Sequence, residues 1–260
     1  RLTLTPSISW SCHHGVSTHK AKVRSNNTSG VMVMADRNAY LAEMEVVCWR
    51  RRGSSVAAEH AAGSAMGSSP NQAGTAAGVS WEKLQREVAS CTRCALHDSR
   101  RNTVFGSGST DADWFFVGEA PGREEDRQGI PFVGRAGQLL SAMLFSLGLS
   151  HEEVYIANVL KCRPPDNRDP QGVEVNNCES FLHRQVAHIG PRIIVALGRF
   201  AAQALLQQDV AISQLRGKVH QYNIDQLPLV VTYHPAYLLR SPTAKAKSWQ
   251  DLMLARSAIE

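Results

Sequence analysis

The sequence has no run of about 18 apolar residues, the length that a membrane-spanning helix requires. It also has no segment that resembles a cleavable secretory signal, and its 260 residues are enough to build a hydrophobic core without covalent cross-links. A disulfide scaffold is therefore not expected from its six cysteines. Metal or cluster ligation is the better first expectation for them.

The sequence also has no large net charge of either sign. The formal net charge is +5, with 43% hydrophobic and 20% charged residues, a composition typical of a soluble globular protein. The mild positive balance favours a polyanionic partner such as nucleic acid, although many proteins without such a partner share it. Charge alone therefore does not decide the function.

Acidic residues are absent from positions 1–33, which contain Arg1, Lys20, Lys22 and Arg24 among many Ser and Thr. That composition resembles an organelle transit peptide. The favoured alternative is upstream sequence or a fragment end, because Met34 opens a plausible start. We expect this segment to be disordered and the protein to be cytoplasmic and bacterial, with organelle targeting as the second reading.

Residues 34–52 have helical apolar spacing and predict a short amphipathic helix. Residues 53–80 are small and polar and predict a flexible linker. Regular alternation of strand and helix patterns begins only at residue 81. We therefore expect the functional domain to occupy residues 81–260.

Short apolar runs predict four buried strands in this domain, and segments of helical spacing lie between them. The predicted strands are 114–117, 154–159, 193–197 and 229–232, and the predicted helices are 81–89, 136–147, 177–189, 199–207 and 244–257. The alternation predicts an α/β fold, a three-layer α/β/α sandwich with a central four-stranded mostly parallel sheet. Ligands of such sheets bind at the carboxyl ends of the strands.

The unusual motifs follow these strands. GEAPGREED (118–126) and GIPFVGRAG (129–137) follow the first strand, NVLKCRPP (158–165) the second, and HPAYLLR (234–240) the fourth. In this order they resemble the type-4, iron–sulfur uracil-DNA glycosylases over roughly residues 81–256. The resemblance implies a monofunctional enzyme that flips uracil out of DNA and hydrolyses its N-glycosidic bond. We expect a monomer, because nothing in the sequence pattern demands a partner. The abasic site that remains would enter base excision repair.

Four cysteines form a candidate metal site. Cys91 and Cys94 have chelating spacing, Cys162 follows the second strand, and Cys178 lies at the start of a predicted helix. Four thiolates can hold a [4Fe–4S] cluster or a zinc ion, and spacing does not choose between them. The family resemblance favours the cluster, in a structural role. Cys12 and Cys48 lie outside the motif and are expected to be ordinary thiols.

The substrate-binding candidates are Gly118, Ala120, Phe132, Asn158 and His234. An aromatic face can stack on a flipped base, and an amide can pair with N3–H and O4 of uracil while mismatching cytosine. Taken alone, Phe132 also suits a core position and Asn158 a turn. The resemblance implies that Phe132 stacks on uracil and that Asn158 reads its edge, with the backbone amide of Ala120 assisting.

The catalytic candidates are His234, Glu119 and Glu125. A histidine aimed at O2 of the leaving uracil would stabilise its negative charge, and the sequence leaves its protonation state open. Where better-known uracil glycosylases have an Asp that positions water, this chain has Ala120. Glu125 is the favoured substitute for holding the water and Glu119 is the second candidate, with loop capping or pairing to Arg123 or Arg127 as the alternative. No lysine is placed for a Schiff base.

Residues 237–240, which begin with Tyr237, are expected to form a wedge in the DNA, because apolar side chains can fill the gap left by a flipped nucleotide. The DNA-binding candidates are Leu238, Leu239 and Arg240, and Arg suits a phosphate contact. Two other functions remain open from the sequence. One is a cluster- or zinc-stabilised nucleic-acid-binding module without catalysis, and the other is a glycosylase for a different deaminated base, such as hypoxanthine.

Overall fold

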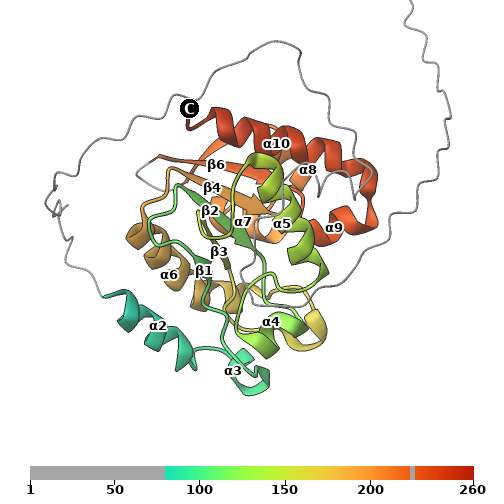
Figure 1. The fold of residues 1–260 in the computed structure, drawn as a ribbon. Helices are drawn as coiled ribbons and strands as arrows, with labels where there is room; N and C mark the ends of the chain where they lie inside the picture. Colours follow the sequence, from blue (N-terminus) through green and yellow to red (C-terminus); the bar gives the residue numbers. More distant parts are fainter. Residues whose placement is uncertain (1–79, 223–225) are drawn as a thin grey trace, which may run out of the picture. The chain divides into compact units, whose positions relative to one another are not determined.

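The computed structural model describes residues 80–222 and 226–260, so the predictions for 1–33, 34–52 and nearly all of 53–80 lie outside the described residues (Figure 1). The described part centres on one six-stranded sheet in the order β1-β3-β2-β4-β6-β5. The strands are β1 (Ser107–Gly108), β2 (Trp114–Gly118), β3 (Val154–Asn158), β4 (Ile193–Leu197), β5 (Val219–Tyr222) and β6 (Leu227–Thr232). The four central strands run parallel, and β1 and β5 pair antiparallel at the edges.

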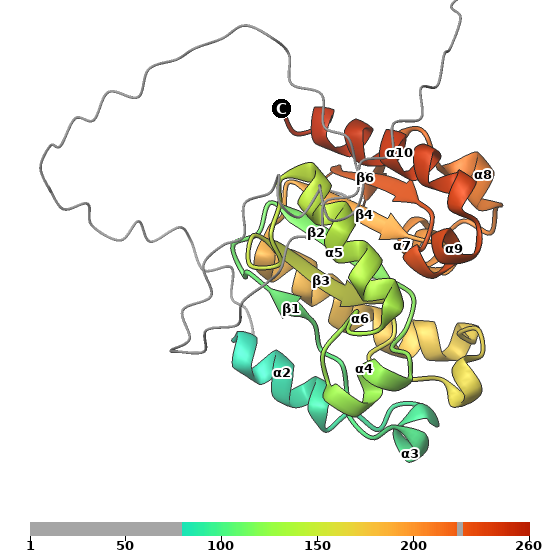
Figure 2. The ribbon, with the colours of Figure 1, turned by 45° about the vertical axis from the view of Figure 1, so that its right-hand side comes forward.

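Helices cover both faces of the sheet (Figures 1 and 2). They are α2 (Trp81–Ala89), α3 (Leu96–Ser99), α4 (Arg123–Gln128), α5 (Arg135–Leu147), α6 (Gly172–Ile189), α7 (Arg199–Leu206), α8 (Ile212–Leu215), α9 (Pro235–Arg240) and α10 (Lys245–Ser257), with 3₁₀ turns at Pro165–Asn167 and Pro242–Ala244. None of the helices in the described ranges is long and apolar enough to cross a membrane.

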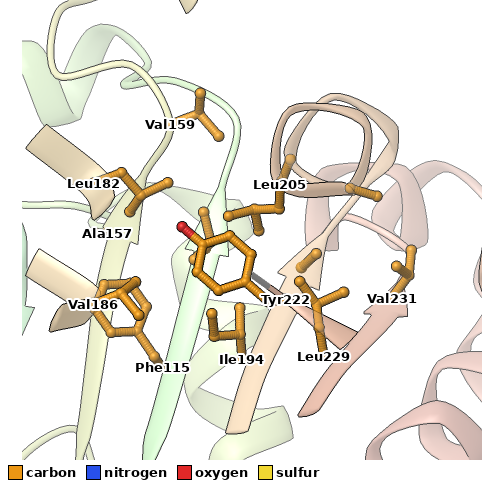
Figure 3. Packing of buried hydrophobic residues seen from close by; sticks show 14 of the residues in the cluster. Phe115, Ala157, Val159, Leu182, Val186, Ile194, Leu205, Tyr222, Leu229 and Val231 are labelled. Carbon is orange, nitrogen blue, oxygen red and sulfur yellow. The ribbon is translucent and has the colours of Figure 1, made fainter. Parts of the chain in front are cut away.

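Alternate residues of the central strands face opposite layers, because successive side chains of a strand point to opposite sides. Phe115, Ile194 and Leu229 pack under α6 and α7 with Leu182 and Leu205 (Figure 3). On the other face, residues of the same strands, including Phe116, Ile156 and Val195, pack against α5 and α10. Since both faces are buried, the central strands are continuous apolar runs, as is typical of parallel sheets.

The predicted α/β class and the four central strands are confirmed, but the sheet has two more strands than expected. β1 has only two residues and β5 is exposed at alternate positions, so neither forms an apolar run. Helix α6 begins at Gly172, five residues before the predicted start at 177. Its N-terminus is fixed by a capping box in which the side chains of Gln171 and Glu174 bond each other's backbone N–H groups.

The parallel order places the carboxyl ends of four strands at one edge of the sheet. β2 ends at Gly118, beside Asn158 at the end of β3, and β4 pairs with β6 up to Leu197 and Thr232. The chain leaves this edge through the segments that carry the four motifs. The fold therefore brings together segments that are up to 120 residues apart in the sequence.

Candidate active site

A cavity of about 520 Å³ opens at this edge of the sheet. Six of the predicted residues line it: Glu119, Ala120, Glu125, Phe132, Asn158 and His234. The seventh, Gly118, lies directly beneath Asn158 and Phe132. The predicted catalytic and base-binding residues thus lie together in one cavity.

Gly118 allows Asn158 and Phe132 to approach each other. A Cβ atom at position 118 would lie 2.3 Å from Oδ1 of Asn158 and 2.7 Å from Cζ of Phe132. Real Cβ atoms do not come so close to other heavy atoms, so any side chain here would displace the amide or the ring. The last residue of β2 must therefore be glycine for this cavity to form.

Asn158 ends β3 and is 2% exposed. Buried amides normally have hydrogen-bond partners. The side-chain amide of Asn158 has none among the described residues, and it borders the cavity. An unpaired donor and acceptor at a cavity wall are available to a ligand that presents the complementary pair.

Phe132 lies in the loop between α4 and α5 with φ of 55°, a left-handed conformation that costs free energy for a residue with a side chain. Glu125 holds this loop, because its Oε1 accepts hydrogen bonds from the N–H groups of Val133 and Gly134, both at 3.0 Å. The Phe132 ring faces the cavity, 5.7 Å from the His234 ring and inclined to it by 30°. One carboxylate thus fixes the backbone that presents the aromatic face.

His234 caps the N-terminus of α9. Its Nδ1 accepts a hydrogen bond from the N–H of Ala236 at 3.1 Å, so Nδ1 carries no proton. Burial and the nearby Arg240 cation lower the pKa of His234 to about 4. The ring is therefore neutral at physiological pH, with its single proton on Nε2.

Gly198 makes room for this histidine. Its φ is +96°, and a Cβ there would lie 2.9 Å from Cβ of His234. The turn after β4 therefore packs directly against the turn after β6, a contact that was not predicted from the sequence.

Glu119 lies between the end of β2 and α4 and borders the cavity. Burial, reinforced by the negative charge of Asp169 and opposed by Arg199, raises the pKa of Glu119 to about 7. Its carboxyl group forms no hydrogen bond with the described residues. Of the two candidate glutamates, Glu119 therefore has the uncommitted carboxylate, while one oxygen of Glu125 is already bonded to the loop.

The comparisons with known proteins agree with this geometry. The model of the Uracil DNA glycosylase superfamily matches residues 105–253. The type-4 uracil-DNA glycosylase of Archaeoglobus fulgidus is 46% identical over 178 residues, 66% of this chain and 89% of that protein. That of Thermotoga maritima is 42% identical over 182 residues, 69% of this chain and 94% of that protein. The chain belongs to the type-4 uracil-DNA glycosylase family.

The four cysteines of this glycosylase surround a second cavity. Cys91 and Cys94 lie between α2 and α3, Cys162 follows β3, and Cys178 lies on α6, and all four border one space. Apolar residues that include Val88, Leu160 and Phe181 enclose them. Within the described ranges no three such side chains converge on a point that a single metal ion could occupy. The space that the four cysteines border is small, about 10 Å³.

Donors on the chain point at two of these sulfur atoms. Arg100 donates from Nη1 to Sγ of Cys162 at 3.2 Å and to the carbonyl of Cys91 at 2.7 Å. The backbone N–H of Lys161 donates to Sγ of Cys178 at 3.3 Å. Burial raises the pKa of the Cys178 thiol to about 11, so a thiolate there requires strong positive charge close by. The donor set suits a thiolate-bound metal group.

The DNA-binding candidates on helix α9 of the glycosylase differ in how far their side chains are exposed. Tyr237 and Leu239 are 39% and 37% exposed, and Arg240 borders the active-site cavity. Leu238 is 1% exposed and faces the interior between α5 and α10. Its side chain anchors α9, so we restrict the wedge hypothesis to the exposed residues of this helix.

Two further residues near the cavity were not singled out in the sequence. Arg168 borders the active-site cavity and forms an ion pair with Glu174, which also caps α6. Lys161, inside the NVLKCRPP motif, is 1% exposed. A lysine is normally exposed, so only its position between Asn158 and Cys162 could have drawn attention to it.

Proposed function

We propose that this chain extrudes uracil from DNA into the 520 Å³ cavity and hydrolyses the bond between base and sugar. Extrusion costs a few kcal/mol, which contacts inside the cavity must offset. The observation that carries the proposal is the meeting of Phe132, Asn158 and His234 in one cavity. The products are free uracil and an abasic site.

The base is held by stacking and by hydrogen bonds. The ring of Phe132 stacks on the flipped uracil, a contact that contributes about 1–3 kcal/mol. The free amide of Asn158 accepts from N3–H and donates to O4. Cytosine presents the reverse polarity at these positions, so its entry leaves buried polar groups unpaired. Ala120 adds its backbone N–H at the same wall.

We expect Asn158→Ala to lower the rate of uracil release by about 10- to 150-fold, since a bidentate base contact contributes about 1–3 kcal/mol to discrimination. Release should be measured from matched oligonucleotides with a single uracil or cytosine. Asn176→Ala is the control, because Asn176 is exposed on α6 and borders neither the active-site cavity nor the cysteine cavity. Unchanged uracil release by Asn158→Ala would contradict the recognition role.

The leaving uracil is stabilised by a neutral histidine. As the glycosidic bond breaks, negative charge spreads onto O2 of the base. The N–H at Nε2 of His234 is the donor that remains after Nδ1 has bonded to Ala236. A preorganised donor of this kind loses little reorganisation energy at the moment of reaction.

In this proposal, Glu119 positions the attacking water. Glu125 instead holds the loop that carries Phe132, because its Oε1 accepts hydrogen bonds from two N–H groups of that loop. Because the pKa of Glu119 is raised to about 7, its carboxylate form is populated only above that pH. The rate of release should therefore rise about tenfold per pH unit below pH 7 and level off above it.

Glu119→Gln should abolish this rise and lower the plateau by about 10²-fold, the low end of what a positioned acid or base contributes. Single-turnover rates between pH 5 and 9 measure both effects. Glu124→Gln is the control, since Glu124 is half-exposed and paired with Arg127. A variant of Glu119 that keeps the full pH dependence would remove Glu119 from the mechanism and leave Glu125 as the candidate.

The DNA is held at the mouth of the cavity. Tyr237 and Leu239 fill the space vacated by the flipped nucleotide, and Arg240 contacts phosphate. One chain supplies every residue that the proposal uses, so a monomer is sufficient for it. No step uses a lysine nucleophile, because Lys161 is buried away from the cavity.

We propose that Cys91, Cys94, Cys162 and Cys178 would hold a [4Fe–4S] cluster. Four thiolates can also hold zinc, and the likeness to the type-4 glycosylases is what favours the cluster. When bound, the cluster supplies a structural cross-link between the loop after α2, the end of β3 and α6. The N–H donors of Arg100 and Lys161 satisfy the sulfur lone pairs.

Glycosylase activity itself is tested with a labelled oligonucleotide containing one uracil, followed by alkali to cut abasic sites. Cleavage at the uracil position only after alkali is expected. Binding of the oligonucleotide without base release, by a sample with full iron content, would instead support the binding-module alternative.

A further inference from the structure

Lys161 has an environment that is unusual for a lysine. Its side chain is 1% exposed and is among the largest fully buried side chains in the described residues. A buried charge is tolerated only when hydrogen bonds replace its hydration. Its partners therefore indicate what it is for.

The ammonium group has two strong acceptors. Nζ donates to the backbone carbonyl of Asn158 at 2.7 Å and to Oε1 of Gln185 at 2.6 Å. Gln185 is itself fixed, because its Nε2 donates to the carbonyl of Phe105 at 2.9 Å and to the hydroxyl of Tyr155 at 3.3 Å. The network holds the ammonium group at one position, against the carbonyl of Asn158.

That carbonyl has no strand partner. β1 pairs with β3 only at Tyr155 and Ile156, and beyond these residues no strand of the described part of the chain lies along that side of β3. On the opposite side, the N–H of Val159 continues the pairing to Gly118. Lys161 thus supplies the donor that the ladder lacks, at the residue whose side chain borders the active-site cavity.

The backbone of Lys161 is bonded to residues around the cysteine cavity. Its N–H donates to Sγ of Cys178, its carbonyl accepts from the N–H of Val104 at 2.8 Å, and Cys162 follows directly. One residue therefore contacts a predicted cluster ligand with its backbone and the base-reading residue with its side chain. Lys161 borders the cysteine cavity and not the active-site cavity.

We propose that Lys161 is a positioning residue for uracil recognition, which holds the backbone of Asn158 in place and couples the base-reading amide to the cysteine-bound loop. The proposal rests on the recognition role proposed for Asn158. The position of the Asn158 amide is tightly restricted, since it lies against Gly118 and Phe132. A displacement of about 1 Å at such a site can cost about 10²-fold in rate.

The test is a double-mutant cycle of Lys161→Met and Asn158→Ala. Methionine fills similar space without a donor, and apolar replacement of a buried charge is often tolerated. Lys161→Met should lower the single-turnover rate of uracil release by about 10- to 100-fold in the wild-type background. In the Asn158→Ala background it should have almost no effect, because the group that it positions is gone.

Iron per protein and melting temperature are measured on every variant. The control is Arg93→Met, which removes a side chain that stacks on Phe181 and bonds Ser180 beside the same cysteine cavity, without contacting Asn158. Arg93→Met should leave the rate within about twofold of wild type. If Lys161→Met does not retain iron, Gln185→Met replaces it in the cycle, since this variant removes the acceptor that orients the ammonium group.

The outcomes separate the two proposals. Equal losses from the lysine or glutamine variant in both backgrounds would mean a general structural role and would overturn the positioning proposal. An unchanged rate in the wild-type background would overturn it as well. If Asn158→Ala alone leaves uracil release intact, the recognition role fails first, and the positioning proposal fails with it.

Discussion

Replacing His234 with alanine should lower the rate constant for uracil release by about 10²–10³-fold, with little change in affinity for uracil-containing DNA. Charge appears on O2 of uracil only as the bond to the sugar breaks. A donor aimed at that oxygen therefore acts mainly in the transition state and hardly at all in the ground state. Binding by fluorescence anisotropy and single-turnover release separate the two effects.

The proposed mechanism also specifies which form of His234 is active. Because Nδ1 accepts from Ala236 and the pKa is lowered to about 4, the neutral ring is the donor above about pH 5. In the Glu119→Gln background, where the other titration is removed, the rate should be flat between pH 6 and 8. A rate that falls as pH rises through about 6.5 would mean that the imidazolium is the donor, contrary to the structure.

A matched histidine controls for general damage. His183 lies on α6 beside Tyr222, on the sheet face that carries the apolar core of Figure 3. His183→Ala should leave release within about twofold of wild type. A loss similar to that of His234→Ala would indicate that histidine substitutions disturb the fold rather than the leaving-group contact.

The sequence predicts most of the sheet for a clear physical reason. The central strands are buried on both faces, so they are unbroken apolar runs such as Ile193–Leu197. The edge strands have no such signal: Ser107–Gly108 is held by pairing with β3 alone. The first turn of α6 was missed although Gln171 and Glu174 have the spacing of a capping box. Local capping chemistry therefore carried information that the apolar pattern did not.

The sequence predicts which residues line the cavity but not which role each of them has. The motifs follow strand ends, and parallel strands place those ends together, so a shared cavity was expected. Which oxygen of Glu125 is occupied, which nitrogen of His234 is protonated, and that Leu238 faces inward all depend on contacts between segments distant in the sequence. Lys161 illustrates the same limit, since only burial reveals that a lysine acts inside the protein.

Cys162→Ala should have the largest effect on stability. Cys162 is buried, and its sulfur accepts from Arg100, which also bonds the carbonyls of Cys91 and Ala89. Loss of a bound metal group belongs to the few changes that cost about 4 kcal/mol or more. For a domain of this size that corresponds to a fall in melting temperature of about 8–16 °C. Iron content and visible absorption should be lost together.

The same substitution should weaken base recognition, because the loop that Cys162 anchors is linked through Lys161 to Asn158. At a temperature where the variant remains folded, its residual uracil release should be slower than that of wild type. Cys12→Ser and Cys48→Ser are the controls, since both residues lie outside the predicted ligand set, and neither should change iron content or rate. A colourless Cys162→Ala variant with wild-type melting temperature and rate would show that the fold and the active site are independent of the cysteine cavity. That result would remove the cluster from the proposed function while leaving the roles of Asn158 and His234 intact, because those roles rest on contacts within the other cavity.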